Sequence, residues 1–288
     1  MTLLQVIVLA IVQGLAELLP VSSSAHVVVA EKLLGLDPSA PPLTLLLVML
    51  HTGTMLAVIL YFWREWRAIY FRSAAALRSF AVQVAIATAL TGVIGLGIAR
   101  LIEKTLLRGV PHAQIEDLFG HLEFIAPALA AAGLLILVAG LLEKRRRAGL
   151  AAAQDLDAGS AAVIGAVQGL CLPFRGFSRS GATISTGMLL GIAKPRAEAF
   201  SFALAVVLTP PVVAREALRL MHDVHAGGAA QLRPVALLTL FGAVVALFAG
   251  LLALRWLSRW LETGRWYLFG VYCLLAALAV SFLHRAGY

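Results

Sequence analysis

Residues 12–26, VQGLAELLPVSSSAH, place side chains that can do chemistry inside apolar sequence. Gln13 and Glu17 are four residues apart, so they share one face of a helix. A charge inside a membrane costs on the order of 3 kcal/mol even on insertion scales, so Glu17 is expected to face a cavity. Ser23 is a candidate nucleophile, and His26 is its candidate acid or base. The structural alternatives are a Glu17 that is capped by backbone or reaches the headgroups, and a His26 that is buried and hydrogen-bonded.

A second polar stretch, FRGFSRSGATIS at residues 174–185, has the same design. Both stretches break an apolar helix at Pro or Gly and place hydroxyl groups where the next helix should begin. These hydroxyls belong to Ser22, Ser23, Ser24, Ser178, Ser180 and Thr183. A helix N-terminus binds anions through its unpaired N–H groups and its dipole, and the planar fork of Arg179 matches phosphate. Simple helix capping is the alternative, but two such N-termini that met would bind two anionic groups, such as a diphosphate.

The composition predicts an all-α integral membrane protein. Of the 288 residues, 61% are hydrophobic and 13% are charged, and the mean hydropathy is +0.92. Several apolar windows approach the ~20 residues that a helix needs to cross a bilayer. The windows are residues 43–63, 80–99, 124–142, 198–214, 235–254 and 266–283.

The tetrapeptide VQGL occurs at residues 12–15 and again at 167–170. The apolar windows that follow begin at matching distances from each copy, which predicts an internal repeat. We expect one polytopic membrane domain, 1–288, made of repeat A, about 1–147, and repeat B, about 160–288. Two short, broken segments around each copy predict a re-entrant helical hairpin, which needs protein or a water-filled cavity around it. Three crossings per repeat would give inverted-topology repeats with six full transmembrane helices and two re-entrant hairpins.

The distribution of basic residues predicts the orientation in the membrane. Thirteen of the 23 Lys and Arg residues lie in one set of loops, at residues 64–79, 143–160, 194–197 and 255–265. The positive-inside rule places these loops in the cytoplasm and therefore both termini in the periplasm. The net charge of +8 is spread over short loops rather than gathered in one patch, so a nucleic-acid partner is not expected.

The two polar stretches resemble the signatures of the bacterial undecaprenyl-diphosphatase family, the bacitracin-resistance type. The first signature is present as QGLAE at residues 13–17, followed by PVSSSAH. The second, P-G-x-S-R-S-x-x-T, is present as RGFSRSGAT at residues 175–183, with Arg175 where the family usually has Pro. The segments LHTGTMLAVILYF and AFSFALAVVLTPP also resemble the family, so the resemblance covers most of the chain.

The resemblance implies an enzyme that hydrolyses undecaprenyl diphosphate to undecaprenyl phosphate and inorganic phosphate. It implies a place in the bacterial inner membrane, with the active site open to the periplasm. It also implies a divalent cation, Mg²⁺ or Ca²⁺, and no organic cofactor. Because Gln13 replaces a carboxylate, we expect a cation held largely by substrate phosphates, with Glu17 as its protein ligand. The expected partners are the lipid substrate and the bilayer, with a homodimer as the alternative to a monomer.

The candidate residues divide into two groups. The catalytic candidates are Glu17, Ser23, His26 and Arg179, and the substrate-binding candidates are Gln13, Ser22, Ser178, Ser180 and Thr183. Glu17 is expected to bind the cation or to act as general base. His26 as direct nucleophile, and attack by water, are alternatives to Ser23. Residues 51–54, HTGT, either line the cavity or pack inside it.

Two other classes of protein share parts of this pattern. Lipid phosphatases of the vanadium-haloperoxidase-like type need a second His six residues after the Arg, and that position here is Ser185. A polyprenyl-phosphate flippase or transporter is the other alternative, because inverted repeats with broken helices are also a transporter architecture. A combination of Ser, His, Glu and Arg suits hydrolysis better than binding alone.

Overall fold

The computed structural model describes residues 1–36, 41–105, 108, 115–148, 155–225, 229–262 and 264–287. Within these ranges the regular structure is helical. The helices are α1 (Leu3–Leu18), α2 (Ser23–Leu33), α3 (Pro41–Ile69), α4 (Ala74–Thr105), the 3-10 helix η1 (Ile115–Gly120), α5 (Leu122–Ala148), α6 (Ala158–Cys171), α7 (Arg179–Leu189), α8 (Lys194–His225), α9 (Ala229–Glu262) and α10 (Tyr267–Arg285).

Five helices in the described part of the chain are long and apolar enough to cross a membrane. These spans are Pro42–Ile69, Ala74–Thr105, Leu122–Arg145, Ala236–Leu257 and Tyr267–Arg285, and they correspond to five of the six expected windows. The remaining window, 198–214, lies inside α8. That helix has 32 residues and contains Pro210 and Pro211, and it is not among the five. The expected all-α membrane protein is therefore confirmed.

The helices of the second half repeat the spacing of the first. Helices α1 to α4 begin at residues 3, 23, 41 and 74, and α6 to α9 begin at residues 158, 179, 194 and 229. The packing is paired in the same way, because α1 lies against α9 and α6 lies against α4. A Cβ on Gly14 would come within 2.5 Å of Ala249 Cβ, and one on Gly169 within 2.9 Å of Ile94 Cβ. The glycine of each VQGL copy therefore lets a short helix cross a long helix at close range.

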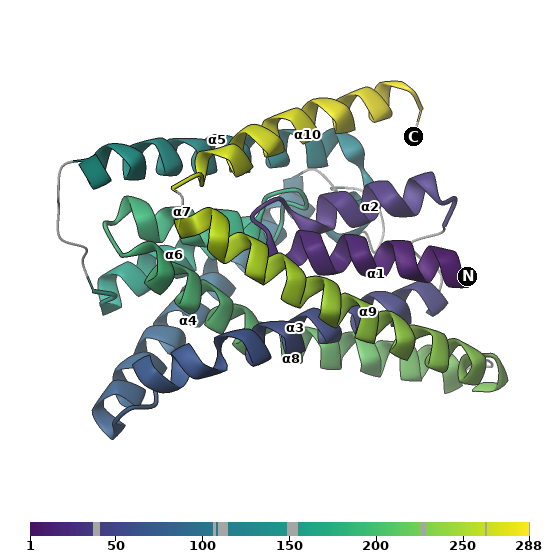
Figure 1. The fold of residues 1–288 in the computed structure, drawn as a ribbon. Coiled ribbons are helices and arrows are strands. Elements are labelled where there is room, and N and C mark those ends of the chain that lie inside the picture. The colour runs from purple at the N-terminus through teal and green to yellow at the C-terminus, as the bar shows by residue number, and fades with distance from the viewer. Residues whose placement is uncertain are drawn as a thin grey trace.

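Each pair of short helices forms a hairpin. The start of α1 is fixed by a capping box of Thr2 and Gln5, and the start of α6 by Asp157, whose side chain accepts from the backbone N–H of Ser160. That hydrogen bond lowers the pKa of Asp157. Figure 1 shows α1 and α2 on the side of the molecule where both termini lie, with α6 and α7 toward the opposite side.

The second half of each hairpin begins close to the expected position. Helix α7 starts at Arg179, among the expected hydroxyl groups, because the side chain of Ser178 accepts from the N–H of Gly181 and caps the helix. Ser22 stands before α2 with φ 68°, and its side chain makes no capping hydrogen bond. A non-glycine residue in the left-handed region is uncommon, and such residues gather at functional sites.

Candidate active site

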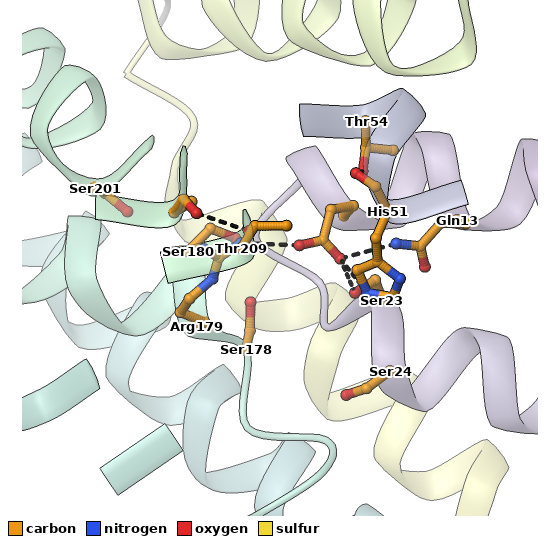
Figure 2. A network of polar contacts seen from close by, with 12 residues as sticks. Gln13, Ser23, Ser24, His51, Thr54, Ser178, Arg179, Ser180, Ser201 and Thr209 are labelled. Carbon is orange, nitrogen blue, oxygen red and sulfur yellow. Dashed lines mark hydrogen bonds and ion pairs between the residues drawn. The ribbon is translucent and has the colours of Figure 1, made fainter. Parts of the chain in front are cut away.

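Glu17 lies in the last turn of α1 and is contacted from both halves of the chain. Arg179 Nη2 donates to its Oε1 at 2.8 Å. Ser23 Oγ donates to its Oε2 at 2.5 Å, and Gln13 Nε2 donates to the same oxygen at 3.2 Å. His51 Nε2 lies 4.0 Å from Glu17 Oε2. Figure 2 shows the labelled side chains of Gln13, Ser23, His51 and Arg179 converging on one place, and the hydrogen bond of Arg179 joins residues that are 162 positions apart.

The start of α7 delivers Arg179 to this carboxylate. The side chain of Ser178 caps the helix, so Arg179 is its first residue. Ser180 Oγ donates to the carbonyl of Leu19, in the turn after α1, at 3.4 Å. The guanidinium of Arg179, at the N-terminus of α7, therefore meets Glu17 in the last turn of α1. A guanidinium has five N–H donors, so the one donated to Glu17 leaves others for a ligand.

The loop before α7 is a tight turn in which Arg175 replaces the family proline. The backbone N–H of Phe177 donates to the carbonyl of Phe174 at 3.1 Å, and Gly176 has φ +99°. This is the pattern of a type II turn, which needs glycine at its third position and accepts most residues at its second. Arg175 therefore keeps the turn. The N–H of Gly176 donates to Ser24 Oγ at 3.2 Å, which ties the two hairpin turns together.

His26 has partners other than Ser23. Its Nδ1 lies 2.8 Å from the carbonyl oxygen of Ser22, and its Nε2 lies 2.7 Å from the hydroxyl of Tyr272. Ser23 donates to Glu17 instead. The expected pairing of Ser23 with His26 is therefore corrected, because the turn before α2 directs the serine toward α1 and the imidazole toward α10. Tyr272 was missed because one tyrosine within an apolar window carries no signal of its own.

All five predicted substrate-binding residues are buried. The exposed fractions are 1% for Gln13, 4% for Ser22, 2% for Ser178, 5% for Ser180 and 0% for Thr183. Thr183 Oγ1 donates to the carbonyl of Arg179 at 2.9 Å and lies 2.6 Å from Ser201 Oγ. In this structure the hydroxyls of Ser178 and Thr183 are hydrogen-bonded within the first turn of α7.

A pocket opens beside the carboxylate. It is lined by Glu17, Leu18, His51, Thr54, Met55, Val58, Arg179, Phe202, Ala205, Val206 and Thr209. His51 and Thr54 of the HTGT motif therefore line the pocket, which is one of the two alternatives for this motif. Thr52 is not among the lining residues, and its Oγ1 donates to the carbonyl of Val48. Thr209 was missed, although it follows Thr54 by the same interval that separates the two VQGL copies. Polar side chains and an apolar wall together suit a phosphate group on a lipid.

The donor atoms of the pocket decide what kind of cation the site fits. Among the described residues no group of three His, Cys, Asp or Glu side chains is placed to hold a metal ion. Glu17 supplies a carboxylate, and a carboxylate together with substrate phosphates is a common way to hold Mg²⁺. The described residues therefore offer a cation one carboxylate and do not form an all-protein cage.

The fold and the site define a helical membrane protein with an acidic, basic and hydroxyl cluster between two hairpins, of the kind that handles phosphate. The family model of the bacitracin resistance protein BacA matches residues 6–279. The chain belongs to this family. It is 57% identical over 277 residues to undecaprenyl-diphosphatase 2 of Acinetobacter baylyi, covering 95% of each chain. It is also 36% identical to the undecaprenyl-diphosphatase of Gluconacetobacter diazotrophicus, over 98% of this chain and 96% of the relative.

Proposed function

We propose that this protein hydrolyses undecaprenyl diphosphate to undecaprenyl phosphate and inorganic phosphate. The observation that carries the proposal is the contact of Ser23 Oγ with Glu17 Oε2, at 2.5 Å, beside the guanidinium of Arg179. A hydroxyl bonded to a carboxylate is an activated nucleophile, and a neighbouring guanidinium stabilises the charge that develops during phosphoryl transfer. The names of the relatives favour hydrolysis over the alternative of a flippase.

The reaction takes place in two steps. Ser23 Oγ attacks the terminal phosphorus, its proton passes to Glu17, and the bond between that phosphorus and the bridging oxygen breaks, so undecaprenyl phosphate leaves. Water then attacks the phosphoserine and releases inorganic phosphate, with Ser23 taking back a proton. Arg179 and the first N–H groups of α7 hold the phosphoryl oxygens in both steps. Glu17 would also hold Mg²⁺ or Ca²⁺, which supplies charge neutralisation when it is bound with the diphosphate.

The nucleophile is tested by trapping the intermediate. Purified protein is mixed with undecaprenyl diphosphate that carries a labelled terminal phosphate and is quenched within milliseconds. We expect an acid-stable label on Ser23, which the Ser23→Ala variant lacks. An acid-labile label that disappears in His26→Ala would make the histidine the nucleophile, and turnover without any label would favour direct attack by water. If the wild-type protein released no phosphate, the proposed function would be wrong.

The same proposal includes the layout in the membrane. α8 would complete six full spans, the hairpins α1–α2 and α6–α7 would be re-entrant, and the two repeats would be inverted. The support is the repeated spacing of the helices and the position of both termini on one side of the molecule (Figure 1). The protein would lie in the inner membrane with its site open to the periplasm. A homodimer is compatible with this layout, and nothing in the site requires one.

Reporter fusions test this topology. An alkaline phosphatase fused after residue 288 should be active, because that enzyme folds only in the periplasm. The matched fusion after Ala148, at the end of α5, should be inactive, because the basic residues 144–147 keep that end in the cytoplasm. The opposite pair of results would contradict the proposed orientation, and two active fusions would contradict the number of crossings.

A further inference from the structure

The side chain of His26 has a defined hydrogen-bonding state. Its Nδ1 faces the carbonyl of Ser22 at 2.8 Å. A carbonyl oxygen only accepts, so Nδ1 must carry a hydrogen, and the neutral imidazole keeps its lone pair on Nε2. Any proton transfer or attack on phosphorus by His26 must therefore use Nε2. That nitrogen lies 2.7 Å from the hydroxyl of Tyr272.

Tyr272 can satisfy both protonation states of His26. A tyrosine hydroxyl donates and accepts, so it donates to Nε2 of the neutral ring and accepts from the N–H of the charged ring. The two rings are nearly parallel, with an interplanar angle of 10° and centroids 5.7 Å apart. Ring stacking and the hydrogen bond together fix the orientation of the imidazole.

Helix α10 is itself held firmly at this point. A Cβ on Gly270 would come within 2.5 Å of the backbone nitrogen of Leu137, so α10 lies directly against α5. Cys273, the neighbour of Tyr272, is fully buried and its Sγ donates to the carbonyl of Pro20 at 3.4 Å. Adjacent residues of α10 therefore contact the first hairpin on both sides of Ser23, at Pro20 and at His26.

We propose that Tyr272 is a positioning residue that fixes the orientation of the His26 imidazole, and that the second half of the chain in this way completes the catalytic turn of the first. The proposal rests on the proposed function and adds His26 to it, because the two proposed steps use only Ser23, Glu17 and Arg179. Tyr272 acts through His26 and makes no contact with the phosphorus. Its ring is 44% exposed, so it contributes little to packing, and its hydroxyl can be removed without opening the core.

The test is a double-mutant cycle on purified protein, with phosphate release from undecaprenyl diphosphate as the readout. Tyr272→Phe should lower kcat by about threefold to tenfold, the worth of one hydrogen bond. KM should stay unchanged, because Tyr272 makes no contact with the substrate. The matched control is Tyr267→Phe on the same helix, whose ring faces Lys144 and keeps that contact, and it should leave both quantities unchanged.

The cycle also separates positioning from stability. In the His26→Gln background, Tyr272→Phe should cost no further activity, and the unfolding temperature of Tyr272→Phe should match that of Tyr267→Phe. An equal loss in both backgrounds, or full activity of His26→Gln, would overturn the proposal. A rise in KM in place of the fall in kcat would overturn it as well. All these outcomes require an active wild type, so they are distinct from a failure of the proposed function.

Discussion

Replacing Glu17 with glutamine is expected to lower the rate of phosphate release by about 100-fold to 10,000-fold, the range for loss of a general base. The amide keeps the shape of the carboxylate, but it cannot take the proton of Ser23, whose hydroxyl lies 2.5 Å from Oε2. Its oxygen can still accept from Arg179, so the fold should persist. Initial rates at saturating substrate, with and without added Mg²⁺ or Ca²⁺, measure the effect.

The matched control for this substitution is Glu31→Gln. Glu31 is 1% exposed and lies on α2 of the same hairpin, outside the pocket that contains Glu17. The substitution changes a buried carboxyl group without touching Ser23, and phosphate release should stay at the wild-type rate. A Glu17→Gln variant that keeps more than a tenth of wild-type activity would contradict the role of Glu17 as base. A shift only in the cation concentration required would assign Glu17 to the cation alone.

Replacing Arg179 with lysine should lower kcat by about 100-fold to 1,000-fold, which is the usual loss when one group that stabilises the transition state is removed. Lysine keeps the charge and can still pair with Glu17, but it lacks the planar fork that binds two phosphoryl oxygens at once. The larger effect is expected on kcat rather than on KM, since charge on the transferred phosphoryl group develops in the transition state. Steady-state kinetics separate the two constants.

The control for this variant comes from the same loop. Arg175→Lys keeps the charge at the second position of a type II turn, which accepts most residues, and should leave kcat unchanged. Arg179→Ala differs from Arg179→Lys because it leaves the Glu17 carboxylate, 15% exposed, without its ion-pair partner. It should therefore also lower the unfolding temperature. Equal activity of Arg179→Lys and wild type would show that a point charge is sufficient and that the fork is not used.

Much of the fold could be predicted from local sequence. The apolar windows, the broken segments around each VQGL copy and the serine at the start of α7 all depend on hydropathy, helix propensity and capping, which act over a few residues. The window 198–214 is less clear, because Pro210, Pro211 and the charged residues of α8 lower the mean hydropathy of that helix. The repeated VQGL motif marked Gly14 and Gly169 as special positions. It could not show which helices they contact, because those helices are distant in the sequence.

The residues that form the site could be predicted, but the contacts between them were predicted less well. Glu17 and Arg179 stood out because charged side chains inside apolar sequence are costly unless they have a partner. Which partner each one takes depends on how the chain closes. Ser23 pairs with Glu17 because the turn at Ser22, with φ 68°, rotates the start of α2, and three-residue spacing to His26 could not reveal that.

The sequence by itself determined that this is a helical membrane protein with two broken hairpins, and which charged and hydroxyl groups they carry, because those properties follow from local composition and spacing. The tertiary structure alone decided that Thr183 is anchored by Ser201, that Thr209 faces the pocket, and that Tyr272 reaches His26. These contacts join helices far apart in the chain, and hydrogen bonds act only over about 3 Å. Only the packing of α7, α8 and α10 brings such groups within that distance.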